Sequence, residues 1–330
     1  MTRPSFQTYR RAAMALDPIH VGDGGNRLGR VDSTIVRDPV TELPKIPGSS
    51  YAGVARAYAA MGYEAGREQG QRPESYYPGC AGQGQPATGQ GHCGKSDCPI
   101  CTVFGFARNN GGGFAGLAAF SDLHLLLHPV ASREGPVWVT SPSALIGVVE
   151  PECGVRDTQT AYTDLTSHPI NLGWLMLPTK PLSGGKNLER LKDVLNEEGL
   201  GIPDYILQRL VVVSDKLFHH VVNSTLEVRT SVAIEPSTGA ADDGALFTYE
   251  ALPRGSVLTW TVTCRNPAHF KVGKESVQAV TNPNDVLDVV KEGDEYLENL
   301  GIGGMNTRGM GRLRVIGPAA EPSRKKEGAA

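Results

Sequence analysis

Four of the six cysteines of this 330-residue chain lie in one segment that is otherwise rich in glycine, glutamine, proline and serine. Cys80, Cys93, Cys98 and Cys101 follow the spacing C-x12-C-x4-C-x2-C. Zinc takes four thiolate or imidazole ligands in a tetrahedron, and a C-x2-C pair is a common half-site. The pattern predicts a structural Zn²⁺ site in which His92 could replace Cys93, and the competing interpretation is four free thiols. Four protein ligands leave no open position for catalysis.

Aspartates gather in a second region, near the N-terminus. Asp32 and Asp38 lie at the two ends of a short alternating strand predicted over 31–36, and Asp17 and Asp23 precede them. A carboxylate in a loop can bind a divalent cation or help to position a nucleophile. Spacing alone favours the simpler interpretation, that these are solvated turn residues.

A candidate anion site follows directly. Proline and glycine end the preceding segment, and a helix is predicted over 51–65, immediately after Ser49 and Ser50. A serine before a helix accepts a backbone N–H, and the remaining free N–H groups attract anions. Lys45 and Arg56 add positive charge on either side, so the segment suits a phosphate group. The alternative is an ordinary capped helix after a loop.

Two further segments are rich in glycine, 20–25 and 301–312. Glycine lets the backbone approach a ligand closely. The second segment lies between a predicted helix and a predicted strand, which is the reverse of the strand–loop–helix order of a dinucleotide-binding fingerprint, so a Rossmann site is excluded. Its backbone, together with Thr307 and Arg308, could instead contact a phosphodiester chain.

The elements that must position these residues mix strands and helices in the α+β manner, with antiparallel sheets expected. The clearest is a hairpin with a long tip over 226–250, where alternating residues run into Pro236 and Gly239 and then return. The other predicted strands are 114–128, 136–140, 256–264 and the final LRVIG, and residues 7–20 are predicted to be a strand that leads into a loop, with a helix as the alternative. The other segments with helical spacing are 186–197, 284–299 and 204–222, the last of which Ser214 and Asp215 divide into a short strand and a helix.

Composition limits the possible functions. The net charge of −3 excludes a uniformly basic nucleic-acid binder but leaves room for local basic patches. No stretch reaches the roughly 18 apolar residues that a membrane span requires. The N-terminus lacks the apolar run of a signal peptide. A cytoplasmic protein without a membrane partner is therefore expected.

Four segments, taken together, resemble a known family. Residues 31–56, VDSTIVRDPVTELPKIPGSSYAGVAR, resemble the N-terminal signature of the RAMP superfamily of CRISPR proteins, and residues 303–315, GGMNTRGMGRLRV, resemble its C-terminal glycine-rich signature. Residues 120–142 look like the strand pair, and residues 234–258 like the hairpin, of the backbone subunit of type III effector complexes. The strand pair is similar to the Cmr type (type III-B), whereas VDSTIVRDP has Csm-like features.

This resemblance implies an α+β fold with a ferredoxin-like (RRM-type) palm, a zinc-stapled insertion and a β-hairpin thumb. It implies a single RAMP domain over 1–317, with the cysteine-rich insertion at about 66–113 and the thumb at about 223–256. Residues 318–330 are expected to form a disordered tail.

The function implied by the resemblance is that of a subunit that binds CRISPR guide RNA and stacks with copies of itself and with other type III subunits. Base-paired target RNA would be cut at regular intervals by a metal-dependent endoribonuclease activity that uses Mg²⁺ or Mn²⁺. By motif position Asp32 supports this transesterification, in which the neighbouring 2′-hydroxyl attacks the phosphate. The residues expected to contact guide RNA are His20, Gly22, Lys45, Ser49, Ser50, Arg56, Thr307 and Arg308.

Two other functions stay open. One is a structural filament subunit that holds guide RNA without cleaving the target. The other is a stand-alone endoribonuclease that processes precursor guide RNA. Relatives with that activity rely on a histidine near the N-terminus, for which His20 is the candidate, and no paired base is evident in the sequence.

Overall fold

The structure is a computed structural model that describes residues 4–24, 31–67, 74–82, 91–107, 112–148, 155, 157–182, 188–197, 199–242 and 246–320. Its helices are α1 (Gly48–Ala65), α2 (Pro99–Phe104), α3 (Leu188–Glu197), α4 (Asp204–Leu207), α5 (Asp215–Ser224), α6 (Pro283–Lys291) and α7 (Asp294–Leu300), with short 3-10 turns η1 (Pro267–His269) and η2 (Asn306–Arg308). None of the described helices is both long and apolar enough to span a bilayer.

The strands, in chain order, are β1 (Phe6–Ala15), β2 (Lys45–Ile46), β3 (Ala118–Phe120), β4 (Leu123–Val130), β5 (Val137–Thr140), β6 (Ala161–Tyr162), β7 (Ile170–Leu172), β8 (Leu175–Leu177), β9 (Thr179–Lys180), β10 (Leu210–Val212), β11 (Glu227–Ser231), β12 (Phe247–Ala251), β13 (Val257–Arg265), β14 (Lys271–Val272), β15 (Glu275–Ser276) and β16 (Leu313–Ala320).

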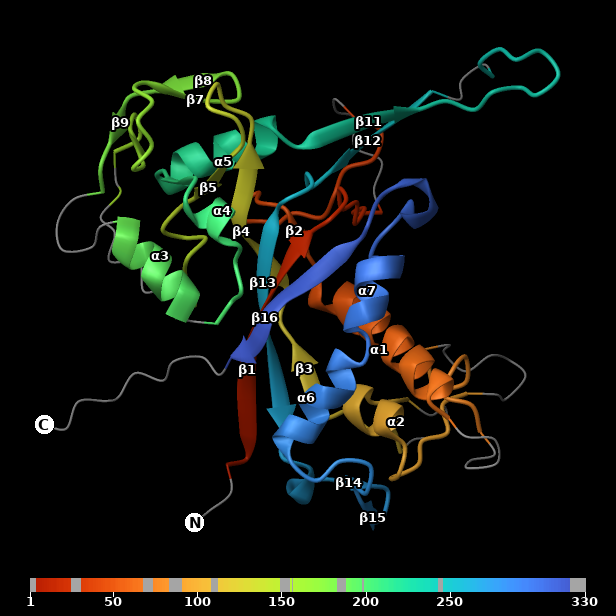
Figure 1. The fold of residues 1–330 in the computed structure, drawn as a ribbon. Helices are drawn as coiled ribbons and strands as arrows, with labels where there is room; N and C mark the ends of the chain where they lie inside the picture. Colours follow the sequence, from red (N-terminus) through yellow and green to blue (C-terminus); the bar gives the residue numbers. More distant parts are fainter. Residues whose placement is uncertain are drawn as a thin grey trace, which may run out of the picture.

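One large mixed sheet runs through the molecule (Figure 1). Its strand order is β16-β1-β13-β4-β5-β10-β6-β9, with β2 paired to β4 and β3 paired to β13. The four strands β16, β1, β13 and β4 pair antiparallel, while β5–β10 and β6–β9 are parallel. The expected mixture of helices with a largely antiparallel sheet is therefore confirmed.

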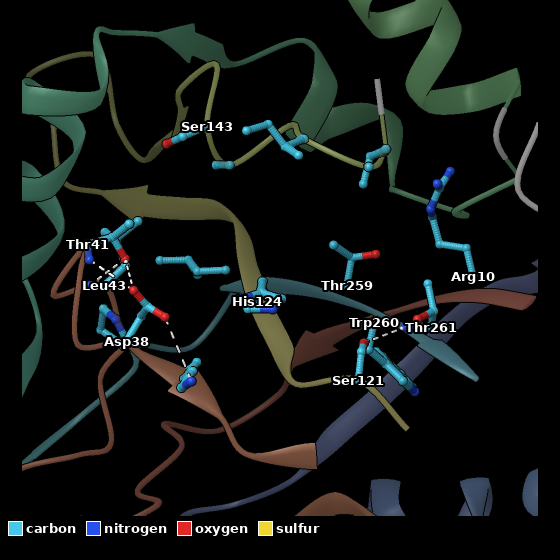
Figure 2. A pocket seen from close by; sticks show the side chains of 17 residues that line it. Arg10, Asp38, Thr41, Leu43, Ser121, His124, Ser143, Thr259, Trp260 and Thr261 are labelled. Atoms are coloured by element: carbon cyan, nitrogen blue, oxygen red, sulfur yellow. Dashed lines mark hydrogen bonds and ion pairs between the residues drawn. The ribbon is translucent and has the colours of Figure 1, made fainter. Parts of the chain in front are cut away.

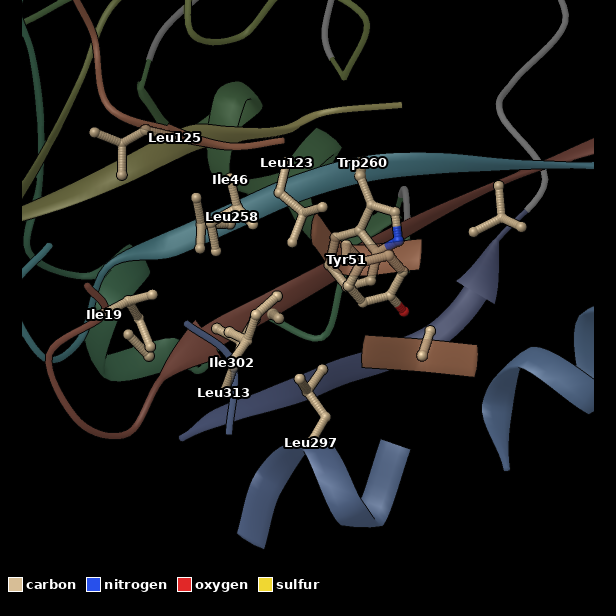
Figure 3. Close-up of a cluster of buried hydrophobic side chains, with 14 of the residues drawn as sticks. Ile19, Ile46, Tyr51, Leu123, Leu125, Leu258, Trp260, Leu297, Ile302 and Leu313 are labelled. Atoms are coloured by element: carbon tan, nitrogen blue, oxygen red, sulfur yellow. The ribbon is translucent and has the colours of Figure 1, made fainter. Parts of the chain in front are cut away.

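The sheet separates two hydrophobic cores. Successive residues of a strand point to opposite faces, so Ala13 of β1 joins the larger core and Ala12 the smaller one. The larger core packs α1, α2, α5, α6 and α7 against one face, and the smaller core packs α3 and α4 against the other. Figure 3 shows part of the larger core, with Tyr51 of α1 and Leu297 of α7 among the side chains of the strands. Burial of apolar surface on both faces fixes the register of the central strands, because a slip by one residue would exchange the two cores.

Tyr51 of α1 lies at the centre of the larger core and is 1% exposed. Its ring makes edge contacts with Trp260 and Phe120 at centroid distances of 5.1 and 5.6 Å. Its hydroxyl accepts a hydrogen bond from Arg11 Nη1 at 3.3 Å, and Arg11 also pairs with Asp294 of α7. Burial raises the pKa of Tyr51 to about 12. This cluster fixes α1 and α7 to β1 and β13.

The β11–β12 hairpin projects from the body of the molecule (Figure 1). Five residues of each strand pair in antiparallel register, from Glu227 opposite Ala251 to Ser231 opposite Phe247. Residues of β11 alternate between partly buried and exposed, whereas β12 is exposed at Phe247 and buried from Tyr249 to Ala251. The tip carries exposed apolar side chains such as Ile234 and Leu246. The predicted hairpin and its protruding tip are confirmed, although residues 243–245 lie outside the described residues.

Three predicted elements differ from the structure. Residues 31–36 form isolated bridges instead of a strand, because their partners alternate between separate segments. The helix expected over 284–299 is two helices, α6 and α7, that meet at Gly293, and its cap is Asn282. The last strand runs to Ala320 and so includes the first three residues of the expected tail, whose remainder, 321–330, lies outside the described residues.

His128 of β4 links the sheet to the root of the hairpin. Its Nε2–H donates to Thr225 Oγ1 at 2.8 Å, and that hydroxyl donates to Val221 O at 2.7 Å. Nδ1 has no hydrogen-bond partner among the described residues. Burial lowers the pKa of His128 to about 3. The imidazole of unfolded protein has a pKa of about 6.5. Between the folded and the unfolded pKa, the unfolded state therefore binds more protons than the folded state, and the free energy of unfolding falls as the pH falls.

We expect His128→Gln to remove this acid sensitivity while retaining a donor for Thr225. Between about pH 7.5 and pH 5 the wild-type imidazole should cost about 2 kcal/mol of unfolding free energy, and the variant should lack that part of the loss. Urea unfolding at the two pH values, followed by tryptophan fluorescence, measures the difference. Equal losses in both proteins would show that His128 is not protonated on unfolding in this range.

Candidate functional site

Several segments that are far apart in the sequence meet at the base of the hairpin, defined here as residues 227–231 and 247–251. Residues 31–37 run beside β12, with a parallel bridge between Ser33 and Tyr249 and a hydrogen bond from Glu250 N to Ser33 O at 3.1 Å. The glycine-rich loop 301–312 lies against residues 18–21, with Gly304 N donating to His20 O at 2.8 Å. The base is therefore shared by three loops.

Asp32 lies at this junction with its carboxylate exposed. Oδ2 accepts hydrogen bonds from Thr248 N and Thr248 Oγ1, both at 2.7 Å, and Asp32 N donates to Thr248 O at 3.1 Å. These bonds from Thr248 lower the pKa of Asp32, so the carboxylate is charged at neutral pH. Oδ1 has no hydrogen bond to the described residues, and it can face a cation or RNA.

The other N-terminal aspartates have structural partners. Asp38 Oδ1 accepts from Val40 N and Thr41 N, at 3.0 and 2.9 Å, and so forms the turn at this position. Asp17 pairs with Arg312, and Asp23 Oδ2 accepts from Thr34 Oγ1 at 2.6 Å. Asp38 is therefore the turn residue that spacing favoured, and Asp32 alone of the two is turned toward the hairpin.

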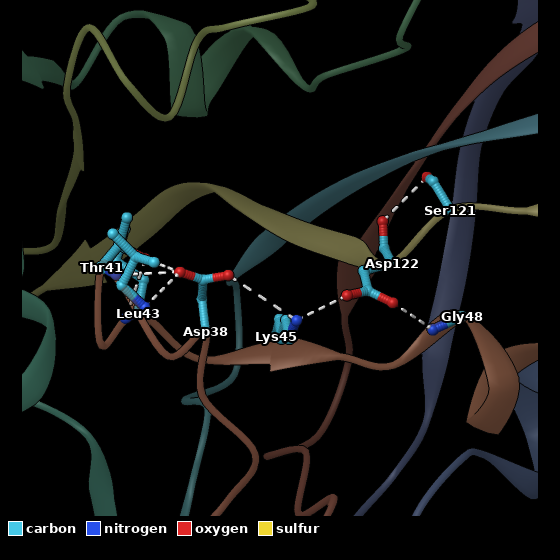
Figure 4. A network of polar contacts seen from close by, with 8 residues as sticks. Asp38, Thr41, Leu43, Lys45, Gly48, Ser121 and Asp122 are labelled. Atoms are coloured by element: carbon cyan, nitrogen blue, oxygen red, sulfur yellow. Dashed lines mark hydrogen bonds and ion pairs between the residues drawn. The ribbon is translucent and has the colours of Figure 1, made fainter.

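The expected serine cap of the first helix is wrong. Helix α1 begins at Gly48, Pro47 occupies the N-cap position, and Ser49 and Ser50 lie within the first turn. A carboxylate takes the place of the cap, because Gly48 N donates to Asp122 Oδ1 at 2.8 Å (Figure 4). Gly48 itself is required here, since a Cβ would lie 2.8 Å from the backbone oxygen of the residue before Asp122.

Lys45 is paired with the same carboxylate. Its Nζ lies 2.7 Å from Asp122 Oδ2 and 3.8 Å from Asp38 Oδ2 (Figure 4). Burial alone would raise the pKa of Asp122, but hydrogen bonds from Lys45 and Gly48 lower it. The basic side chain and the helix N-terminus that were predicted to hold a phosphate are thus neutralised within the chain, and an RNA phosphate would have to compete with Asp122.

The four cysteine sulfurs converge, with every pair within 4.8 Å. Cys93 and Cys101 Sγ are 3.7 Å apart, and Cys80 and Cys98 Sγ are 3.9 Å apart. A tetrahedron with Zn–S bonds of about 2.3 Å has edges of about 3.8 Å, so the cluster fits zinc. None of the four forms a disulfide. His92 is turned away from the cluster, because its Nδ1 accepts from Arg56 Nη2 at 2.9 Å, so Cys93 is the fourth ligand candidate.

The expected contact of Arg56 with guide RNA is not supported by this geometry. Its side chain crosses from α1 into the cysteine segment, where Nε donates to Cys80 O at 2.7 Å and Nη1 to Gly105 O at 2.6 Å. With His92 as the third acceptor, the guanidinium is buried and its hydrogen bonds are satisfied. Arg56 therefore ties the cysteine segment to α1 and does not present its charge to RNA.

His20 is also buried, at 6% exposed, which corrects its assignment as a direct RNA contact. Its Nδ1–H donates to Glu250 O at 2.6 Å, and its ring makes an edge contact with Tyr249. Gly22 lies on the exposed side of this loop, where a Cβ would come within 3.3 Å of His20 Nε2. His20 therefore anchors the hairpin from within the fold, whereas Gly22 is exposed and can contact a ligand.

The C-terminal glycine-rich loop presents Thr307 and Arg308 to solvent on the turn η2. The Arg308 guanidinium makes no hydrogen bond or ion pair with the described residues. The loop is fixed from behind by Gly303, whose φ of +88° and close approach, 2.3 Å from a Cβ to His20 O, exclude any side chain. Thr307 and Arg308 keep the accessible position that a phosphate contact needs.

A pocket of about 380 Å³ opens on the sheet face that carries the smaller core (Figure 2). Figure 2 shows His124 and Thr259 rising from the sheet, with Asp38 on one side and Arg10 on the other. Lys45 also lines this pocket, which therefore borders the Lys45 end of the predicted phosphate site. No sequence pattern indicates this pocket, because its lining residues come from five separate segments.

The side chains that hold the site residues in place were not predicted from the sequence. These are Thr248 for Asp32, Asp122 for Lys45, and the pair formed by Arg37 and Glu250. The motif letters around Asp32 include Arg37, but nothing local marks Thr248 or Glu250, which follow more than 200 residues later. These contacts depend on the fold alone.

Comparison with curated proteins finds relatives in CRISPR systems. The chain is 24% identical to the CRISPR system Cmr endoribonuclease Cmr4 of Pyrococcus furiosus over 329 aligned residues, which cover 94% of this chain and 95% of that protein. A shorter match, 44% identical over 50 residues, is to the Csm3 endoribonuclease of Mycobacterium tuberculosis, and it covers 15% of this chain and 21% of that protein.

Solved structures share the fold. A type III-B Cmr-beta complex bound to cognate target RNA contains a chain with a TM-score of 0.63 and 15% identity, covering 95% of this chain and 98% of that one. Oligomeric Cmr4 from Pyrococcus furiosus gives a TM-score of 0.57 at 19% identity, covering 95% and 100%. The family model of the RAMP superfamily matches residues 13–314. The chain therefore belongs to the RAMP superfamily.

Proposed function

We propose that this chain is the guide-RNA-binding backbone subunit of a type III CRISPR ribonucleoprotein, and that it cleaves base-paired target RNA at regular intervals. Family membership supports this proposal, as do relatives named as Cmr and Csm endoribonucleases. In the solved neighbours, the chains of similar fold belong to a complex bound to target RNA and to an oligomer. Its partners would be guide RNA, target RNA, further copies of itself and other type III subunits.

The architecture supports a palm and a thumb. In the sheet order β16-β1-β13-β4, the strands that come first and last in the chain, β1 and β16, lie side by side. Helix α1 follows β1 along the chain, and α6 and α7 follow β13. This order of strands and helices supports the proposal of a ferredoxin-like palm with helices on one face. The β11–β12 hairpin leaves the palm beyond α5, as a thumb does (Figure 1).

The observation that carries the proposed activity is the exposed, ionised Asp32 held by Thr248 at the root of the thumb. A bound Mg²⁺ or Mn²⁺ would stabilise the negative charge that develops on the phosphate. The 2′-hydroxyl loses its proton to solvent and its oxygen bonds to phosphorus as the bond to the 5′-oxygen breaks. The departing 5′-oxygen takes a proton from solvent, which leaves a cyclic phosphate and a 5′-hydroxyl. Thr248 keeps Asp32 charged and oriented, and Oδ1 faces the RNA or the cation.

Guide RNA would lie along the surface of the residues that remain accessible. Thr307 offers a hydroxyl, Arg308 offers a cation that has no ion pair within the described part of the chain, and Gly22 lets a phosphate approach the backbone. Lys45, Ser49 and Ser50 would contribute once a phosphate displaces Asp122. These groups are sufficient on a chain of net charge −3, because sequence would be read by base pairing and only one groove needs positive charge.

A structural filament subunit without cleavage is the second candidate. Within the described residues, the four cysteines are the one group of three or more His, Cys, Asp or Glu side chains close enough to hold a metal. Asp32 belongs to no such group there. A catalytic cation would therefore take most of its ligands from RNA and water. If those do not suffice, the same surface still binds the guide.

Cleavage by the assembled complex tests the role of Asp32. We expect Asp32→Asn to abolish the regularly spaced products with Mg²⁺ or Mn²⁺, while binding of guide RNA is retained, because the amide has nearly the same shape but no charge. Asp23→Asn changes another exposed carboxylate in the adjacent loop and should leave cleavage intact. Persistent cleavage by Asp32→Asn would refute the catalytic assignment, and no cleavage by the wild type would support the filament function.

We further propose that the cysteine cluster holds a structural zinc ion. Elemental analysis should find about one zinc per chain, and Cys98→Ser should lose it, because a hydroxyl is a poor zinc ligand. Cys264→Ser, which changes a buried cysteine outside the cluster, should retain the metal. Chelation should lower the melting temperature and expose 91–107 to proteolysis, since metal binding free energy is folding free energy for this segment. Metal-free protein with an unchanged melting temperature would refute a structural role.

A further inference from the structure

Arg37 contacts three parts of the chain at the base of the hairpin: α5, the segment 31–37 and β12. Its Nε donates to Asn223 Oδ1 of α5 at 3.2 Å, its Nη1 donates to Ile35 O at 3.1 Å, and its Nη2 pairs with Glu250 Oε2 of β12. The guanidinium thus joins the Asp32 segment, the helix that leads into the hairpin and the strand that leads out of it.

The ion pair is largely buried. The side chains of Arg37 and Glu250 are 16% and 8% exposed, whereas most ion pairs in the described chain are more open to solvent. A carboxylate with so little water around it depends on its partner, because a lone charge in such a place is strongly disfavoured. The position of β12 is therefore tied to the position of Arg37.

The Asp32 segment is hydrogen-bonded along β12. Thr248 donates hydrogen bonds to the Asp32 carboxylate, and Glu250 N donates to Ser33 O. Arg37 closes the other end of this contact. Thr248 thus holds one end of the segment at Asp32, and the Arg37–Glu250 pair holds the other end. The four residues between Asp32 and Arg37 are fixed by both contacts.

We propose that Arg37 is a positioning residue for cleavage, which sets the thumb and the Asp32 carboxylate in one fixed arrangement. The proposal rests on the function proposed above. Arg37 does not reach the substrate; it acts through Glu250 and through the segment that carries Asp32. Seating of the thumb on the guide–target duplex and placement of Asp32 at the phosphate are then a single event, and cleavage positions follow thumb positions.

The test compares Arg37→Gln, Arg37→Lys and the double variant Arg37→Gln/Glu250→Gln in the assembled complex. Arg314→Gln is the control, because it breaks an arginine–glutamate pair with Glu298 that is open to solvent and includes no residue of the hairpin. Three quantities are measured: guide-RNA binding, the single-turnover cleavage rate with the spacing of products, and hydrogen–deuterium exchange of 31–37 and 246–251. Exchange of 257–265 in β13 reports on the rest of the fold.

For Arg37→Gln we expect cleavage to slow roughly ten- to hundredfold, as when a reacting group is displaced by about an ångström, with guide binding unchanged and products less regularly spaced. Exchange should rise together in 31–37 and 246–251 while 257–265 stays protected. Arg37→Lys should fall between, and the double variant should recover much of the rate because two amides can bond to each other without an unpaired charge. Arg314→Gln should match the wild type.

Wild-type cleavage and exchange in Arg37→Gln would overturn the proposal. So would a loss of guide binding and of β13 protection in all three Arg37 variants, which would make Arg37 a general folding residue. Failure of the catalytic role of Asp32 is distinguished by exchange: the two segments would still loosen together in Arg37→Gln, while Asp32→Asn would cleave normally.

Discussion

A hairpin of two strands that extends into solvent cannot stabilise itself, and the rest of the candidate site depends on how its base is held. The base is completed by residues 31–37, which lie beside β12 almost as a third strand. His20 bonds to Glu250 from one side and Arg37 pairs with it from the other. The loop that carries Asp32 is therefore a structural part of the hairpin. The Asp32 carboxylate is exposed, but the contacts of His20 and Glu250 that hold the loop in place are buried.

The cysteine-rich segment faces the same constraint and meets it in another way. It has few large apolar residues, so its described part is organised around four converging sulfurs and the buried guanidinium of Arg56. Arg56 also belongs to α1, whose Tyr51 lies at the centre of the main core. The segment is thereby connected to the main core through α1, which begins beside Lys45 and Asp122. It is also held by α2, which packs against α6, and by the hydrogen bond from Ser96 to Glu275.

Charge at the predicted RNA surface is balanced within the chain. The N-terminus of α1 and Lys45 share the carboxylate of Asp122, and Asp17 pairs with Arg312. Such pairing lets a chain with a small net negative charge keep basic groups in place without a ligand. A phosphate at the N-terminus of α1 would have to compete with Asp122 for Lys45 and Gly48 N, whereas Arg308 makes no such pair within the described residues.

The sequence by itself determined the features that are local: the cysteine spacing, the hairpin with its long tip, and the ordered motifs that resemble the RAMP superfamily. Only the tertiary structure decided what the motif residues contact. Arg56 turned into the cysteine segment, His20 became buried, and the helix was capped by Asp122 instead of serine. Thr248 meets Asp32 across 216 residues of sequence. Periodicity reports on a residue's own strand or helix, whereas such partners are chosen by how the elements pack, and that choice leaves no local pattern to read.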